Sequence, residues 1–247
     1  MPDLVWVLGM VVAAVLGTAA LALFTPLGRK FQRPWRRVTR DHGLTLHVER
    51  RPDRQQLMGL SPPLFFYFPD GSVPTDSPTE TDWWGWAHER GGSDVGFTNI
   101  LLTLQASQDL PVEVGIPEVH HDVVHEPAGT FCGPEGVGGN GLDARRFVIR
   151  LGDDDPITPT YEGMMGEKHS LPRFAMTKND TSEILVTAYA EQGLHRWSLT
   201  IPCVVAGDSV ALKANDDGKP FVTVGRQGLP LHMWADGMWI DAPAGHY

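Results

Sequence analysis

Residues 98–106 read TNILLTLQA, and every second residue from Ile100 onward is apolar. An extended strand points successive side chains to opposite faces, so an apolar residue at every second position builds one apolar face. The residues that would share this face are Ile100, Leu102, Leu104 and Ala106. The stretch therefore predicts a half-buried β-strand rather than an amphipathic helix.

The same alternation recurs along most of the downstream chain. It involves Val112, Val114 and Ile116; Phe147, Ile149 and Leu151; Ile184, Val186, Ala188 and Ala190; Trp197, Leu199, Ile201 and Cys203; and Val222 and Val224. Turn-forming clusters separate these stretches, and no amphipathic helix lies between them, which argues against a parallel α/β sheet. The pattern predicts a mainly β fold, an antiparallel β-sandwich of immunoglobulin-like or related type.

Composition excludes several other classes of protein. The chain has 247 residues, of which 42% are hydrophobic and 20% charged, so it can bury a core and is not a disordered acidic chain. Its 27 glycines and 20 prolines follow no triplet period, which excludes collagen and argues against a helical bundle. Two cysteines cannot build a disulfide scaffold or a four-cysteine zinc site.

The N-terminus carries a long apolar run. Residues 4–24 read LVWVLGMVVAAVLGTAALALF, 21 residues without a charge, which matches the ~30 Å hydrocarbon core of a bilayer. We therefore expect one transmembrane helix within residues 1–27. A cleaved signal peptide is the alternative, because Ala20-Leu21-Ala22 offers a cleavage site, but no basic residue precedes the apolar run.

A basic juxtamembrane segment, residues 28–40, follows the apolar run. Its positive residues are Arg29, Lys30, Arg33, Arg36, Arg37 and Arg40. By the positive-inside rule this side faces the cytoplasm, which places the N-terminus outside and the rest of the chain inside. Phe31 and Trp35 lie among these charges and are expected at the lipid headgroups. The lipid bilayer is thus an expected partner, although the charges could also serve only as a topology signal.

The rest of the chain is acidic. Residues 41–247 hold 14 Lys and Arg against 29 Asp and Glu, a net charge of −15. Such a domain repels nucleic acid, so nucleic acid is not an expected partner. Composition divides this body into a Pro-rich connecting segment with short strands (41–93), a β-sandwich domain (94–227) and an apolar C-terminal extension (228–247).

Several of these stretches resemble a family of actinobacterial proteins of unknown function. The resemblance rests on Thr98–Leu104 (TNILLTL), the loop at 132–140, Arg146–Ile149 (RFVI) with its acidic turn, Trp197–Leu199 (WSL) and Asp217–Phe221 (DGKPF). Such chains often carry an N-terminal membrane helix ahead of a β domain, so the resemblance implies the same architecture here. It implies no activity.

Histidines concentrate in the sequence between Pro117 and Pro127. His120, His121 and His125 lie among acidic residues, and on a helix His121 and His125 would share a face and could hold zinc for a hydrolase. The valines and flanking prolines favour a strand instead, where that spacing separates the two by about 13 Å. A metal-dependent hydrolase using this cluster is one alternative function.

Tryptophans concentrate in two places, Trp83, Trp84 and Trp86 in one and Trp234 and Trp239 in the other. Each group could cover the core, because a large ring buries much apolar area, or could anchor a protein partner. An envelope-facing domain that binds a ligand through Trp83–Trp86 is a further alternative, and it requires the opposite topology.

Cofactor and nucleophile signals are weak. The glycines at 136–141 fit a dinucleotide fingerprint, but a strand follows them where a phosphate-binding helix is required. Cys203 falls on the apolar face of its predicted strand, where a thiol is inert. The sequence therefore predicts no cofactor and no catalytic set. It favours a single-pass, membrane-anchored, non-enzymatic binding or scaffold module with a protein partner.

Overall fold

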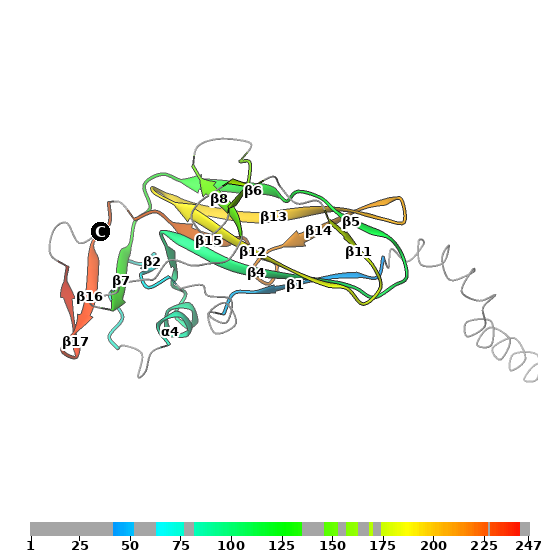
Figure 1. Ribbon diagram of the computed structural model, residues 1–247. Helices are drawn as coiled ribbons and strands as arrows, with labels where there is room; N and C mark the ends of the chain where they lie inside the picture. The colour runs from blue at the N-terminus through cyan, green and yellow to red at the C-terminus, as the bar shows by residue number, and fades with distance from the viewer. Residues whose placement is uncertain are drawn as a thin grey trace, which may run out of the picture. The chain divides into compact units, whose positions relative to one another are not determined.

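The computed structural model describes residues 42–51, 63–76, 82–134, 146–152, 157–162, 168–169, 174–226 and 228–242 (Figure 1). The predicted transmembrane helix, the basic segment 28–40 and the glycines at 136–141 lie outside these residues. Residues Thr45–Tyr247 form one compact unit. No helix within the described ranges is long and apolar enough to span a bilayer.

The first sheet has six strands in the order β1-β4-β12-β8-β9-β10. Their bounds are β1 Leu44–Glu49, β4 Phe97–Ala106, β12 Thr181–Ala190, β8 Arg146–Leu151, β9 Thr160–Glu162 and β10 Lys168–His169. β4 and β12 pair antiparallel over nine registered residues, from Thr181 opposite Gln105 to Tyr189 opposite Phe97. The expected face of β4 is buried, and Ile100, Leu102 and Leu104 are each 0% exposed. The alternation therefore identified this strand and its apolar face correctly. The strand is not half-buried as predicted, because Asn99 and Leu101 on the opposite face are also buried.

The second sheet has eleven strands, nine of which follow the order β11-β5-β13-β15-β3-β2-β7-β16-β17. Their bounds are β11 Phe174–Met176, β5 Val112–Val114, β13 Leu194–Val205, β15 Phe221–Val224, β3 Ser93–Val95, β2 Phe66–Phe68, β7 Thr130–Pro134, β16 Leu231–Ala235 and β17 Met238–Asp241. Two more strands pair with β13, β14 (Asp208–Ala214) and β6 (Glu118–Val124).

The long strand β13 lies at the centre of the pairing in this sheet, because each of its edges pairs with two strands. One edge pairs with β15 and then β14, and the other pairs with β6 and then β5. Pro202 lies where the second edge passes from β6 to β5. A proline cannot donate to a strand ladder, so it is tolerated at this interruption. Its carbonyl still accepts a hydrogen bond from the Gly115 amide at 2.7 Å.

The fold is mainly β, as predicted, but the sheets are mixed rather than purely antiparallel. Three of the described strand pairs are parallel, β8 with β12, β3 with β15 and β7 with β16. Parallel neighbours require a long connection that returns the chain to the same end, and each of these pairs is well separated in sequence. Residue alternation carries no information about strand direction, so the sequence could not reveal this.

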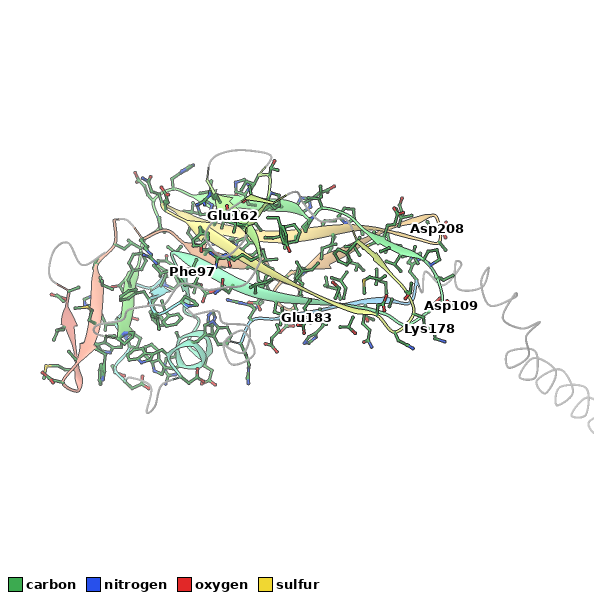
Figure 2. All side chains as sticks on the ribbon, in the orientation of Figure 1. Phe97, Asp109, Glu162, Lys178, Glu183 and Asp208 are labelled. Carbon is green, nitrogen blue, oxygen red and sulfur yellow. The ribbon has the colours of Figure 1, made fainter. Side chains whose placement is uncertain are left out.

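The two sheets meet through buried side chains between β4 and β15. The hydroxyl of Thr223 on β15 donates to Thr98 on β4 at 2.7 Å, and it accepts from the indole of Trp197 on β13 at 2.9 Å. All three residues are 0% exposed. Figure 2 shows Asp109, Lys178 and Asp208 at one end of the strands, whereas Figure 1 shows β16, β17 and the helix α4 toward the other.

Candidate functional site

α4 (Trp83–Glu89) is the helix of the described region, and no periodicity in the sequence predicted it. Asp82 begins it, because its carboxylate accepts a hydrogen bond from the Gly85 amide at 2.8 Å. Three tryptophans and a glycine in seven residues give a weak helix propensity. The helix therefore depends on its cap and on packing of its rings, and the cap was the one local signal in the sequence.

The structure brings the two tryptophan groups together. The Trp239 ring lies 6.0 Å from Trp83, 5.9 Å from Trp86 and 5.1 Å from Trp234, between ring centroids. Trp83 and Trp86 also lie edge to face at 5.6 Å. We call this set, with Trp84 and the β16–β17 hairpin, the aromatic end.

Most of this aromatic area packs against the domain. Trp86 is buried and contacts a cluster formed by Phe66, Phe68 and Cys132, while Trp83, Trp84 and Trp239 are half-buried around it. The rings therefore serve mainly to cover the core, which was one of the two expected roles. The indole N–H groups of Trp86 and Trp239 are buried and find no hydrogen-bond partner among the residues described.

The exposed apolar surface of the aromatic end lies on β17. Met238 is 59% exposed and Ile240 is 37% exposed. β17 is the last strand of its sheet within the described chain and pairs with β16, with Trp239 opposite Trp234 and Ile240 opposite Met233. Because side chains alternate along a strand, Met238 and Ile240 point away from the face that holds Trp239.

Carboxylates accompany this apolar strand. Asp236 occupies the hairpin turn and Asp241 ends β17, while Asp82 and Glu89 lie at the two ends of α4, all four exposed. Arg90 already interacts within the domain, because it pairs with Asp76 at 2.6 Å and lies 5.3 Å from the Trp86 ring centroid. His232 on β16 lies 2.9 Å from Asp241. With four exposed carboxylates around it, the exposed charge of the aromatic end is mainly negative.

A buried ionic network holds α4 to the β domain. Asp94 on β3 accepts hydrogen bonds from His88 of α4 at 2.9 Å and from Arg50, which follows β1, at 3.1 Å. Arg50 also pairs with Asp216 at 2.5 Å and lies 5.6 Å from the Trp84 ring centroid. No local sequence pattern reveals this network, because its members are far apart in the chain.

The environment of Asp94 favours its charged form. Burial alone would raise the pKa of Asp94, but the hydrogen bond from His88, the charge of Arg50 and a hydrogen bond with Thr98 outweigh burial and lower it. Thr98 also accepts from Thr223, so a chain of polar contacts runs from Asp94 to Trp197 in the core. The network thus links the aromatic end to the packing of the two sheets.

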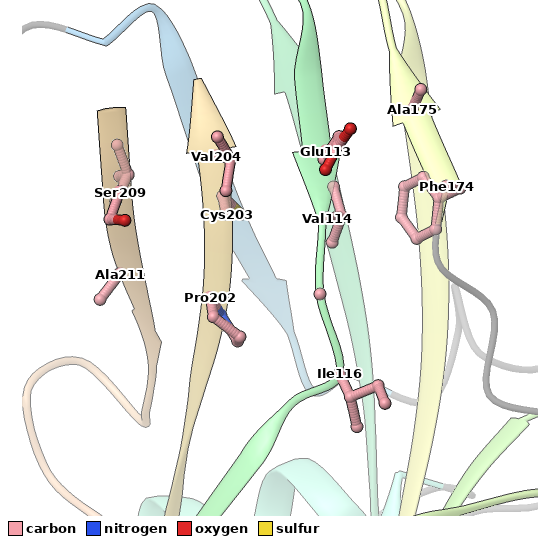
Figure 3. A pocket seen from close by; sticks show the side chains of 12 residues that line it. Glu113, Val114, Ile116, Phe174, Ala175, Pro202, Cys203, Val204, Ser209 and Ala211 are labelled. Atoms are coloured by element: carbon pink, nitrogen blue, oxygen red, sulfur yellow. The ribbon is translucent and has the colours of Figure 1, made fainter. Parts of the chain in front are cut away.

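A wide, shallow groove crosses the outer side of β14, β13, β5 and β11 (Figure 3). Its volume is about 790 Å³. Val204, Pro202 and Phe174 contribute apolar surface, and Glu113 is the charged residue in its lining. The groove offers area but no convergent set of polar groups, so it does not indicate a catalytic centre.

The histidines singled out in the sequence lie on or beside β6, which is a strand, as their context predicted. The His121 Nε2 lies 3.1 Å from the Gly152 carbonyl, and His120 lies 2.9 Å from the Thr200 hydroxyl. His125 follows the end of the strand. The described residues contain no group of three or more His, Cys, Asp or Glu placed to hold a metal ion.

Both cysteines are free thiols inside the domain, Cys132 on β7 and Cys203 on β13. Burial raises the pKa of Cys203 to about 11. For Cys132, burial and the charge of Asp70 raise the pKa to about 12. Since the thiolate is the reactive species, both thiols are expected to react slowly in the folded protein. The predicted burial of Cys203 is confirmed.

Comparison with known proteins adds little. No protein family and no curated protein matches the sequence. Among solved structures, a Bordetella pertussis protein provisionally assigned as ApaA is similar over 75% of this chain and 95% of its own, with 10% identity and a TM-score of 0.27. A likeness at this level identifies neither fold nor function.

Proposed function

We propose that the protein is a membrane-anchored, non-enzymatic binding module that docks a protein partner on β17. The observation that carries this proposal is the pair Met238 and Ile240, which expose apolar side chains on the terminal strand of a sheet. An exposed apolar edge strand favours aggregation unless something covers it. Trp239 of β17 packs against Trp83, Trp86 and Trp234, and these contacts hold the strand in place.

A β-sandwich head is the finer architecture that we propose for the body. Its support is the burial of β4, β12 and β13 and the hydrogen-bond chain from Trp197 through Thr223 to Thr98, which joins one sheet to the other. A sandwich packs two sheets over a shared core and leaves the strand ends and edges for recognition.

The partner that suits β17 is an extended, positively charged segment. Added strands gain affinity from main-chain hydrogen bonds and specificity from side chains on alternate positions. Met238 and Ile240 would contact apolar residues of such a segment, and the carboxylates of Asp236 and Asp241 would attract its basic residues. The net charge of −15 over residues 41–247 likewise favours a positively charged partner.

Substitution of the exposed side chains tests this surface. We expect Met238→Lys combined with Ile240→Lys to reduce recovery of the protein partner at least tenfold, because charge replaces the apolar contact. Stability should change by less than about 1 kcal/mol, since exposed substitutions are usually near neutral. The measurement is quantitative recovery of partner with the full-length protein, beside thermal unfolding.

Val204→Lys is the matched control for this double variant, because Val204 is 39% exposed on the groove of β13 rather than on β17. It should leave partner recovery unchanged. Equal recovery with the β17 variant and the wild type would contradict docking on this strand, and so would an equal loss with Val204→Lys.

Membrane topology is tested by labelling a new thiol in the full-length protein. Thr75 is exposed, so Thr75→Cys should react with a membrane-impermeant maleimide only after cell lysis, if residues 28–40 keep the body in the cytoplasm. The unmodified protein provides the background, because Cys132 and Cys203 are buried. Labelling of Thr75→Cys in intact cells would reverse the proposed orientation.

A further inference from the structure

A second recess lies where β6, β8, β12 and β13 come together, and none of the tryptophans of the aromatic end lines it. Its volume is about 270 Å³, which suits a small molecule rather than a peptide. Its lining includes Val123, His125, Arg150, Leu151, Tyr189 and His195.

Hydrogen-bond donors converge on this recess. Arg150 has a side chain that is 72% exposed, and its contact with Glu162 spans 3.6 Å, longer than a hydrogen bond. A guanidinium carries five N–H donors, so Arg150 can still donate hydrogen bonds to a ligand. Tyr189 accepts a hydrogen bond from Arg146 at 3.0 Å, which allows its own O–H to donate into the recess.

The floor of the recess is held in place by its own contacts. His195, 1% exposed, donates its Nε2 proton to the Gln192 carbonyl at 2.9 Å. The His121 ring stacks on it with 6.2 Å between centroids and donates to Gly152. Gly193 has φ +73°, and an added Cβ would lie 3.1 Å from the Val124 carbonyl, so the turn requires glycine. The recess is therefore preformed.

The charged and apolar residues of the recess favour one kind of anion over another. Val123 and Leu151 provide apolar wall, and the Arg150 guanidinium lies 5.9 Å from the Tyr189 ring centroid. Glu191 lines the recess and Glu162 lies beside it, so a doubly charged phosphate would be repelled. A single carboxylate carries half the charge, so the repulsion is smaller, and its two oxygens match the planar fork of a guanidinium.

We propose that this recess binds a small organic carboxylate. The carboxylate pairs with Arg150 and accepts from Tyr189, and the apolar body of the ligand contacts Val123 and Leu151. This site is independent of β17, so either assignment can fail without the other.

The test uses full-length protein in lipid nanodiscs, with 4-fluorobenzoate as the probe and ¹⁹F NMR as the readout, corrected with empty nanodiscs. We expect saturable binding of 4-fluorobenzoate and at least tenfold weaker binding of 4-fluorobenzyl alcohol, which lacks the charge. Unlabelled benzoate should displace the probe, and inorganic phosphate at the same concentration should not. Absence of saturable binding, equal binding of the alcohol, or equal displacement by phosphate would each overturn the proposal.

Substitutions of lining residues test whether the probe binds in this recess. Arg150→Gln should weaken 4-fluorobenzoate binding at least tenfold, and Tyr189→Phe, which keeps the ring but loses the hydroxyl, should weaken it severalfold. Arg196→Gln is the control, because Arg196 adjoins His195 on β13 but is exposed on the opposite face. Wild-type binding by Arg150→Gln would overturn the assignment, as would an equal loss in Arg196→Gln.

Discussion

Replacing Asp94 with asparagine is expected to lower the free energy of unfolding by about 3 kcal/mol at neutral pH. The substitution keeps the shape of the side chain but removes the charge that faces Arg50 and His88. Arg50 is only 11% exposed, so its largely buried charge would lose the carboxylate of Asp94 while keeping that of Asp216. Breaking one side of a buried ion pair typically costs about 3–5 kcal/mol.

Urea unfolding of the wild type and Asp94→Asn measures this effect, and Asp216→Asn is the matched control. Asp216 binds the same guanidinium, but its side chain is 41% exposed, so its loss should cost less than about 1 kcal/mol. An Asp94→Asn variant as stable as Asp216→Asn would contradict the importance of the buried network.

The same network predicts an acid sensitivity. Because folding lowers the pKa of Asp94, its contribution is fully present above the unfolded value near 3.9 and is lost as pH falls through the folded value. The stability difference between wild type and Asp94→Asn should therefore be constant at neutral pH and shrink below about pH 4.

Replacing Trp197 with alanine is expected to destabilise the domain by about 4 kcal/mol, within the range for large aromatic truncations in cores. Trp197 is 0% exposed, and its ring lies 4.7 Å from that of Phe221. The variant leaves a cavity and also removes the indole donor to Thr223, on the path that joins the two sheets. Urea unfolding followed by circular dichroism measures the loss.

Trp197→Phe separates the two contributions. It keeps most of the ring volume but loses the indole N–H, so we expect a smaller loss of about 1–3 kcal/mol. If Trp197→Ala cost no more than a typical surface substitution, about 0.5 kcal/mol, the proposed core would be wrong.

The strands were predictable because a local pattern determines them. The faces that bury Ile100, Leu102 and Leu104 and that bury Trp197 and Leu199 follow directly from alternation with a period of two. Pairing direction and partner choice depend on tertiary contacts, so the parallel pairs remained hidden.

The candidate site was predictable only in its parts. The sequence singled out Trp83 and Trp239 separately, but their contact depends on β16 pairing parallel with β7, which no local pattern shows. The ionic network was missed because Asp94 lies on a three-residue strand, too short to alternate visibly, and Arg50 follows the end of another strand. Buried charge of this kind is evident only once the fold is known.

Site-specific photo-cross-linking in cells tests whether β17 binds a protein partner. A photoreactive residue at position 238 of the full-length protein should give one discrete adduct with a partner, and the adduct should disappear when Ile240→Lys is added. The same residue at position 204, another exposed apolar position, should not give it. No adduct at position 238, or the same adducts from both positions, would contradict a partner-binding role for β17.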